Sequence, residues 1–447
     1  MQLSSYSFIF IFLPIVLFVY YRAKRYRKAV LLFSSAVFTA CSGLPGLAVL
    51  AASVFINYRF SLFIRGKKNV LICAVTANLL LLGWFKYFGS FFPLGISFYS
   101  IIQIDYLYAL YRGEKPLTGW TDYAVYSSFF PRLSAGPLMD YSKQAGSFKL
   151  RESKGTGWDR AAKGLFLFSI GLFKKTVIAD TLVQFVDAGY SVANINLLQS
   201  WATIICYAFM LYFDFSGYSD MAVAVASFLG YDLPINFNSP YLAEGIGDFW
   251  DRWHISLSKT LTRLVYIPLG GSRKGTVRTM INIMLVFLVS GIWHGAGICF
   301  VLWGLGHGLL LCAEKLAGDY LRRIPRIIRV FLTFIMVSLL WVPFRAGSLS
   351  KTAEVLTAAF NISRIGSFSS LGKLANDGII SFPDIAWATY LVAITAISSL
   401  IVFAFKNSND LTAVFRPTKK NMYTTVCLLT LSVIHLSRLA IFVYTNF

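Results

Sequence analysis

The chain is poor in charged residues, and acidic residues are the scarcest of them. Only 14% of its 447 residues are charged, and 20 Asp and Glu stand against 41 Lys and Arg, for a formal net charge of +21. Soluble domains usually carry about 25% charged residues, so an ordinary soluble protein is excluded. A nucleic-acid-binding protein would share the positive charge, but not together with 57% hydrophobic residues. Intrinsic disorder is excluded because that much apolar surface must be buried.

Cysteine and the common catalytic motifs are scarce too. No CxxC pair, HExxH, P-loop or GxSxG motif occurs, so the sequence gives no support to a metal centre, a zinc protease, an NTPase or a serine hydrolase. Strand-type alternation is absent, which excludes an outer-membrane barrel. The six cysteines are interpreted as small buried hydrophobic residues: Cys41, Cys73, Cys206, Cys299, Cys312 and Cys427.

Long apolar runs dominate what is present. At about 20 residues per crossing, they predict an all-α polytopic membrane protein with roughly ten to twelve transmembrane helices. We expect one membrane domain over 1–447, with N-terminal spans in 1–230, a motif-bearing region in 231–313 and C-terminal spans in 314–447. The runs are 1–21, 29–42, 45–63, 69–88, 94–111, 164–190, 198–230, 279–313, 328–344, 385–405 and 422–445.

Clusters of basic residues predict the orientation. Five positive residues follow the first apolar run, within 22–28, whereas a cleaved signal peptide carries its positive charges before that run. We therefore expect a retained first span with an external N terminus and a cytoplasmic basic cluster. A basic hydrophilic stretch over 143–163 and a late basic loop at 406–420 predict further cytoplasmic loops, with the C terminus outside.

His294 is the strongest candidate for chemistry. It lies in an uncharged run, 279–313, that as a single helix would be about 52 Å long, too long for one crossing of a core about 30 Å thick. Gly291, Gly295 and Gly297 predict a break in this run. Irregular backbone at membrane depth is tolerated where protein or a water-filled cavity surrounds it. His294 is therefore predicted to face a cavity, with a core histidine bonded to a backbone carbonyl as the alternative.

His254 is the second candidate. If its surroundings are helical, Asp251 and Ser258 lie on the same face as His254, and the carboxylate could orient the imidazole. The alternative is a membrane-surface helix with interfacial tryptophans. His307 and His435 are interpreted as structural residues.

Other polar residues in apolar runs leave two hypotheses open. Asp214 and Asp220 would either serve a proton relay or pair with cations, and pairing is favoured. The cations in question are Lys86, Lys174, Lys175 and Arg345.

Several motifs together resemble the membrane-bound O-acyltransferase (MBOAT) family, in particular the bacterial branch typified by the membrane subunit of alginate O-acetylation. The resemblance covers roughly residues 8–346, in matching order. The motifs are Phe10-Ile-Phe-Leu-Pro14, Leu94-Gly-Ile-Ser-Phe-Tyr99, Phe130-Pro-Arg-Leu-Ser-Ala-Gly-Pro137, Gly171-Leu-Phe-Lys-Lys175, Tyr212-Phe-Asp-Phe-Ser-Gly-Tyr-Ser-Asp220, Asn236-Phe-Asn-Ser-Pro-Tyr241, Phe249-Trp-Asp-Arg-Trp-His-Ile-Ser-Leu-Ser258, Tyr266-Ile-Pro-Leu-Gly-Gly-Ser-Arg-Lys274, Gly291-Ile-Trp-His-Gly295 and Phe344-Arg-Ala346.

The resemblance implies an acyltransferase built as a ring of helices around a thinned central channel. It places the family's two histidines at His294 and His254, both taken as catalytic. His294 would accept the proton of an acceptor hydroxyl that attacks a thioester, for which no metal is required. The donor implied is acetyl-CoA, with no bound cofactor. The expected substrate-binding residues are Asn238, Arg252, Trp253, Ser258 and Trp293, and Arg252, Lys259 and Arg273 are either coenzyme phosphate ligands or, as we favour, ordinary loop charges.

The resemblance also implies a place and a partner. We expect an O-acetyltransferase in the lipids of the bacterial inner (plasma) membrane. It would pass the acetyl group to a separate extracytoplasmic acyltransferase protein that modifies an exported or cell-surface polysaccharide, without any role for nucleic acid. Asp251, Arg132 and the stretch Ser258-Lys-Thr-Leu-Thr262 depart from the branch's usual residues, which affects the acceptor and the partner. The alternatives are D-alanyl transfer to teichoic acid from a carrier-protein thioester and a proton-coupled transporter or flippase.

Overall fold

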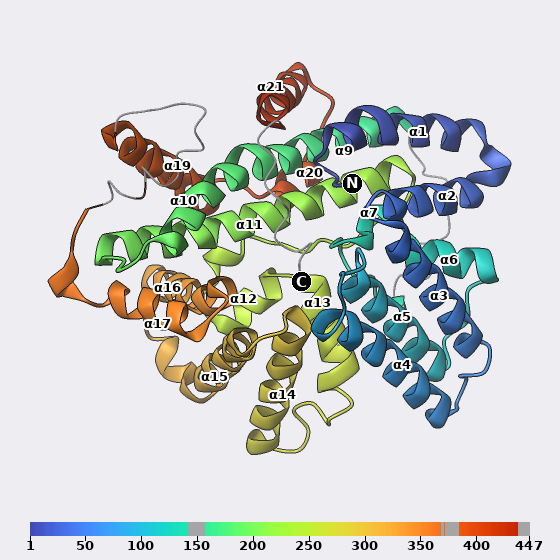
Figure 1. Ribbon diagram of the computed structural model, residues 1–447, viewed down its shortest axis with the longest axis horizontal. Helices are drawn as coiled ribbons and strands as arrows, with labels where there is room; N and C mark the ends of the chain where they lie inside the picture. Colours follow the sequence, from blue (N-terminus) through green and yellow to red (C-terminus); the bar gives the residue numbers. More distant parts are fainter. Residues whose placement is uncertain (142–156, 368–370, 372–383, 437–447) are drawn as a thin grey trace.

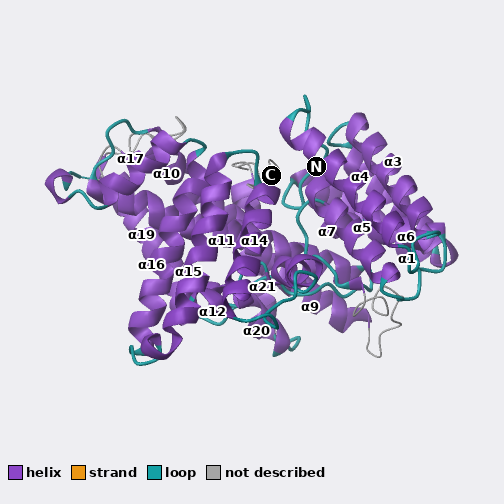
Figure 2. Ribbon diagram, turned by 90° about the horizontal axis from the view of Figure 1, so that it is seen from below, coloured by secondary structure: helices purple, strands orange, loops and turns teal. Residues whose placement is uncertain are grey.

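Helices are the only regular secondary structure in the described part of the protein. The computed structural model describes residues 1–141, 157–367, 371 and 384–436, and no β-strand occurs among them (Figure 2). The α-helices are α1 (Leu13–Arg22), α2 (Arg27–Ala40), α3 (Leu44–Ser61), α4 (Lys68–Tyr87), α5 (Ile96–Tyr111), α6 (Trp120–Ser128), α7 (Phe130–Leu133), α9 (Gly157–Phe173), α10 (Asp180–Ser191), α11 (Leu197–Phe228), α12 (Ile246–Arg252), α13 (Ile255–Leu261), α14 (Thr276–His294), α15 (Ile298–Leu321), α16 (Arg326–Ala346), α17 (Leu349–Ala359), α19 (Asp384–Ala404), α20 (Ser408–Ala413) and α21 (Lys419–His435). Short π-helices cover Ser7–Phe12, Lys174–Ala179 and Thr262–Tyr266, and 3₁₀ turns cover Lys24–Tyr26, Pro240–Leu242 and Ile362–Arg364.

The all-α polytopic architecture is confirmed. Within the described ranges, seven helices are long and apolar enough to cross a membrane, namely α3, α4, α11, α14, α15, α16 and α19. The first two apolar runs, expected as separate spans, form one pair bent by 108° that would make an eighth. The number is below ten to twelve because other apolar runs form shorter helices. One of them is α5, which has only 16 residues and is buried along almost its whole length.

The uncharged run 279–313 is broken where the glycines predict. Helix α14 ends at His294, α15 begins at Ile298, and the two pack side by side. Three residues, 295–297, make the turn between them, so the run forms a hairpin of two helices in place of one overlong helix.

The 32-residue helix α11 forms the centre of the protein. Figure 1 shows it running through the middle of the molecule, alongside α9 and α10, with the short helices α12 and α13 near the centre of the view. Gly171 and Gly217 permit the contact with α9, since a Cβ on either would lie within 2.7 Å of the other's carbonyl oxygen. Most of α11 is buried, as expected for a hydrophobic helix enclosed by others.

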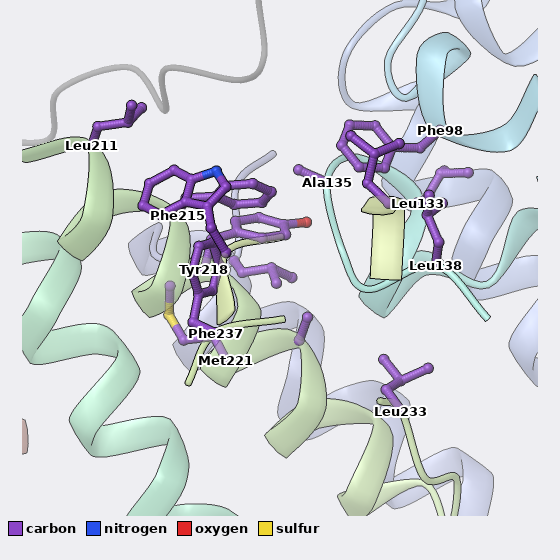
Figure 3. Close-up of a cluster of buried hydrophobic side chains, with 14 of the residues drawn as sticks. Phe98, Leu133, Ala135, Leu138, Leu211, Phe215, Tyr218, Met221, Leu233 and Phe237 are labelled. Atoms are coloured by element: carbon purple, nitrogen blue, oxygen red, sulfur yellow. The ribbon is translucent and has the colours of Figure 1, made fainter. Parts of the chain in front are cut away.

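A second contact joins α11 to the N-terminal helices. Figure 3 shows Phe215 and Phe237 on one side and Phe98, Leu133 and Leu138 on the other, all of them within one buried hydrophobic cluster. The cluster connects α5 and α7 with α11 and with the segment that precedes α12.

Basic residues gather at one end of the helices, which we call the basic end. Helix pairs α3–α4, α4–α5, α14–α15 and α15–α16 are hairpins with short links, so their ends alternate. Lys86, near the C-terminal end of α4, donates a hydrogen bond to the Trp293 carbonyl near the C-terminal end of α14, which aligns the two sets of hairpins. The basic end then holds Arg65, Lys67, Arg112, Arg273, Lys274, Arg322 and Arg326.

Two expectations fall partly outside the described residues. Most of the basic stretch 143–163 and the last residues of the run 422–445, including the C terminus, are not described. The division into 1–230, 231–313 and 314–447 stays a prediction.

Candidate active site

His294 lies at the last position of α14 and is buried, with 2% of its surface exposed. Its ring packs edge-on against Trp303 of α15 and Phe344 of α16, at centroid distances of 4.9 and 5.4 Å. The flanking glycines are needed for this packing. A Cβ on Gly291 would lie 2.4 Å from the Phe300 carbonyl oxygen, and one on Gly295 would lie 2.0 Å from the Phe300 ring. The glycine–histidine–glycine pattern therefore lets α15 approach the end of α14 closely.

His254 lies between two short helices. α12 ends at Arg252, α13 begins at Ile255, and His254 has left-handed backbone angles, φ 43° and ψ 48°. Asn236 holds this break because its carbonyl accepts from the Ile255 N–H at 3.0 Å and its side chain accepts from the Ser256 N–H at 3.2 Å. A non-glycine residue in this conformation is uncommon and worth attention.

The His254 ring is buried, and neither of its nitrogens has a hydrogen-bond partner within the described residues. Its ring packs edge-on against Phe215 of α11 at 4.7 Å. Buried polar atoms are normally hydrogen-bonded. The free nitrogens therefore mark His254 as a residue that can donate to, or accept from, a bound ligand.

The break at His254 corrects one conditional expectation. Asp251 and Ser258 would share its face on a continuous helix, but the left-handed residue turns the chain and separates them. Asp251 is exposed and forms no hydrogen bond to the imidazole. The alternative of a surface helix with interfacial tryptophans is also wrong, because Trp250 and Trp253 are both buried.

His254 and His294 are buried near each other in the protein interior. They are close enough to interact electrostatically, and Lys86 interacts with His294 in the same way. A row of packed tryptophans links the two segments: Trp303, which contacts His294, stacks on Trp341 at 5.8 Å, and Trp341 packs at 5.0 Å on Trp253, the residue before His254.

The contacts of His307 fit its interpretation from sequence as a structural residue, although its buried Nε2 has no hydrogen-bond partner among the described residues. Its Nδ1 accepts a hydrogen bond from the Trp250 indole at 3.3 Å, and its ring packs against Phe249, Trp303 and Trp341. In the described part of the chain, no group of three or more His, Cys, Asp or Glu could hold a metal ion.

A cavity of about 660 Å³ leads inward from the basic end. Its outer part is lined by Lys315, Arg322 and Arg329, and its inner part reaches Trp250 and Ser290. Since Ser290 is one helical turn before His294, this cavity ends close to the histidine.

Three of the four acidic residues that line the cavity at the basic end already bind other groups of the protein. Glu314 accepts from the Ile246 and Gly247 N–H groups at the start of α12. Glu244 pairs with Arg329 at 2.7 Å, and Asp248 pairs with Arg252 at 2.6 Å. Asp251 forms no ion pair with a described residue, and neither do the cations Lys315 and Arg322.

A smaller cavity, of about 360 Å³, lies at the opposite end of the helices. It is lined by Lys86, Ser90, Gly295, Ala296 and Phe300, among others. Gly295 directly follows His294, so the histidine lies along α14 between residues that line the two cavities, although His294 itself lines neither of them.

Of the five expected substrate-binding residues, only Ser258 lines the cavity that leads in from the basic end. The two tryptophans are buried in the protein interior and do not line it. Trp293 is buried and donates its indole N–H to the Ser97 carbonyl at 3.2 Å, and Trp253 is fully enclosed by aromatic rings.

Asn238 and Arg252 lie outside that cavity's lining. Asn238 is exposed and accepts from Asn407 at 3.0 Å. Arg252, Lys259 and Arg273 do not line the cavity either. The cations that do, Lys315, Arg322 and Arg329, were missed because in sequence they look like any other basic loop cluster.

The buried carboxylates of α11 are paired with lysines, which is the favoured one of the two hypotheses. Asp220 lies 2.7 Å from Lys174 and Asp214 lies 2.8 Å from Lys175, which also contacts Asp180 at 2.7 Å. All five side chains are almost completely buried. They fasten α11 to the π-helix Lys174–Ala179.

Proteins of similar sequence show which family this chain belongs to. A family model of membrane-bound O-acyltransferases matches residues 107–342. A peptidoglycan O-acetyltransferase of Helicobacter pylori is 35% identical over 98% of this chain and 96% of its own length. A probable alginate O-acetylase of Pseudomonas aeruginosa is 36% identical over 81% of this chain and 75% of its own length. A teichoic acid D-alanyltransferase of Bacillus subtilis is 29% identical over 41% of this chain and 48% of its own length.

These matches and the apolar helices define the class of protein, a multi-pass membrane acyltransferase. More particularly, the chain belongs to the membrane-bound O-acyltransferase family, since the family model covers more than half of it and a relative matches nearly all of it. The family resemblance and the enzyme class expected from sequence are confirmed.

Proposed function

We propose that this protein is an O-acetyltransferase of the bacterial plasma membrane that moves acetyl groups outward from cytoplasmic acetyl-CoA. The observation that supports the proposal is the place of His294, which is buried on α14 between Ser290, in the lining of the cavity at the basic end, and Gly295, in the lining of the cavity at the opposite end. Such a residue can meet a donor from one side and an acceptor from the other. The relatives named O-acetylases and O-acetyltransferases cover more of the chain than the D-alanyltransferase does.

Charge supports the orientation. Cytoplasmic loops carry an excess of Lys and Arg, so the basic end would face the cytoplasm and the Lys86 end the outside. The cavity of about 660 Å³ would then receive acetyl-CoA, with Lys315 and Arg322 near its phosphates. The N terminus would lie outside, as the sequence predicts.

The proposed reaction uses His294 as its general base. His294 takes the proton of an acceptor hydroxyl, whose oxygen attacks the thioester carbonyl. The carbon–sulfur bond breaks, the coenzyme leaves as a thiolate, and the proton on His294 passes to it. The products are an acetyl ester and free coenzyme A.

His254 supplies the second polar contact of this reaction. One of its buried ring nitrogens would donate to the carbonyl oxygen as negative charge develops, in the manner of an oxyanion hole. The unused nitrogens of His254 support this role.

The acceptor enters from the outer cavity. At about 360 Å³ it has room for a side chain or a small group but not for a polysaccharide. We therefore propose that a separate extracytoplasmic acyltransferase presents its own hydroxyl and later transfers the acetyl group to a surface glycan. Peptidoglycan and alginate, named for the two relatives above, are the first acceptors to test.

The central test uses purified protein, its partner and acetyl-CoA labelled in the acetyl group. Release of coenzyme A should depend on His294, and His294→Ala should lose about 100-fold or more of the rate. Unchanged turnover in His294→Ala would refute the role of His294 as general base. The same assay with a D-alanyl carrier protein as the donor tests the alternative reaction. If the protein consumes that thioester but not acetyl-CoA, D-alanyl transfer is favoured.

A further inference from the structure

The charged residue Lys86 lies in an otherwise apolar stretch of α4. No other charged residue occurs between Lys68 and the end of the helix. A charged side chain in a membrane segment is costly, so one that is retained usually has a partner and a role. The mechanism proposed above does not use it.

The partner of Lys86 is the last turn of α14. Its ammonium donates to the Trp293 carbonyl and lies 5.9 Å from the centre of the Trp293 ring. The last carbonyls of a helix have no partner within the helix, and a cation there also interacts favourably with the helix dipole. Lys86 therefore completes the hydrogen bonding of α14 at the residue directly before His294.

Two further bonds hold the same turn. The Tyr87 hydroxyl donates to the Ile292 carbonyl at 3.3 Å, and the Trp293 indole donates to the Ser97 carbonyl at 3.2 Å. Helices α4 and α5 thus fix Ile292 and Trp293 from outside, while Phe300 of α15 closes on Gly291 and Gly295 from the other side. His294 has its position set by this arrangement.

Lys86 also lies at the boundary between the outer cavity and His294. It lines that cavity together with Gly295, and it interacts electrostatically with His294. A change at Lys86 therefore acts on the acceptor side of the site and leaves the cavity at the basic end untouched.

We propose that Lys86 is a positioning residue for His294: it holds the Trp293 carbonyl so that the imidazole meets the incoming hydroxyl. This inference rests on the proposed acetyl transfer but makes a separate claim. A misplacement of about 1 Å can cost about 100-fold in rate, so a loss of 10- to 100-fold in kcat is expected when the bond is removed.

The test compares Lys86→Met, which removes the charge and the donor, with Lys86→Arg, which keeps both. The matched control is Lys68→Met, on the same helix but exposed at the basic end. Lys86→Met should lose 10- to 100-fold in kcat with the KM for acetyl-CoA within twofold of the native protein, and Lys86→Arg should recover most of the loss. Equal kcat in Lys86→Met and Lys68→Met would overturn the proposal, as would equal losses in the Met and Arg variants.

A second measurement does not depend on acetyl transfer. Diethyl pyrocarbonate modifies histidine rings, and mass spectrometry of the His294 peptide gives its rate of modification. That rate should change at least threefold in Lys86→Met and stay unchanged in Lys68→Met. If Lys86→Met cannot be purified, Lys86→Gln takes its place in both assays. Failure of the native protein to consume acetyl-CoA would refute the proposed function, whereas an unchanged modification rate would refute the role of Lys86.

Discussion

Replacing Gly291 by alanine tests whether the close contact of α14 and α15 sets the active site. The added Cβ would lie 2.4 Å from the Phe300 carbonyl oxygen and 3.2 Å from its carbonyl carbon. These are backbone atoms, so no side chain can rotate away to make room. A separation of about 1 Å is needed to reach ordinary van der Waals contact, near 3.4 Å.

The expected loss follows from that displacement. Gly291 is three residues before His294, so a shift of the helix pair by about 1 Å moves the imidazole by a similar amount. Overpacking a core costs about 1–3 kcal/mol, and a misplacement of about 1 Å costs about 100-fold in rate. We expect Gly291→Ala to remain folded with a lower melting temperature and to lose about 100-fold in turnover of acetyl-CoA.

The assay pairs coenzyme A release with thermal unfolding in detergent. Gly83→Ala is the control, because a Cβ there meets nothing within 4 Å and the change from glycine favours a helix. It should leave turnover unchanged and the melting temperature unchanged or slightly higher. Turnover of Gly291→Ala within twofold of the native rate, at an unaltered melting temperature, would refute the idea that this contact positions His294.

Three other substitutions test different parts of the structure. His254→Gln should lower kcat by about 100-fold with only a modest fall in the melting temperature, because the ring packs on Phe215 but is hydrogen-bonded to no described residue; a large fall in stability would instead point to a structural role. Lys175→Met should destabilise the protein by about 3–5 kcal/mol, as it leaves buried carboxylates uncompensated, and adding Asp214→Asn should recover part of the loss in thermal unfolding. Trp250→Phe removes the N–H that donates to His307 together with part of a buried ring that packs on Phe287 and Trp303, so unfolding should report a loss of about 1–3 kcal/mol, and no loss would mean that neither the bond nor the packing adds stability.

The sequence pointed to the candidate site through residues that are individually unusual. An uncharged run too long for one crossing, with three glycines around His294, predicted the helix break that the structure has at 295–297. The resemblance to a family of known enzymes then pointed to His254 as well. Both histidines are buried in one interior, which local pattern alone could not establish.

The supporting contacts could not be predicted in this way. His254 was weighed as part of a continuous helix, because nothing local in its sequence requires a left-handed residue. The bonds from Asn236 that hold it come from a separate segment before α12. Likewise, the cations of the first cavity, Lys315, Arg322 and Arg329, lie close to the site only because α15 folds back along α14.

Composition and hydropathy by themselves determined that this is an all-α membrane protein. Only α-helices and closed β-barrels satisfy all backbone hydrogen bonds in lipid, and the sequence has no strand pattern. The scarcity of acidic residues and the basic clusters likewise predicted one basic end. Tertiary structure alone decided which charged groups pair, where the cavities lie and what surrounds His294. Those features depend on contacts between helices far apart in sequence, such as Lys86 with Trp293, and a linear pattern carries no record of such contacts.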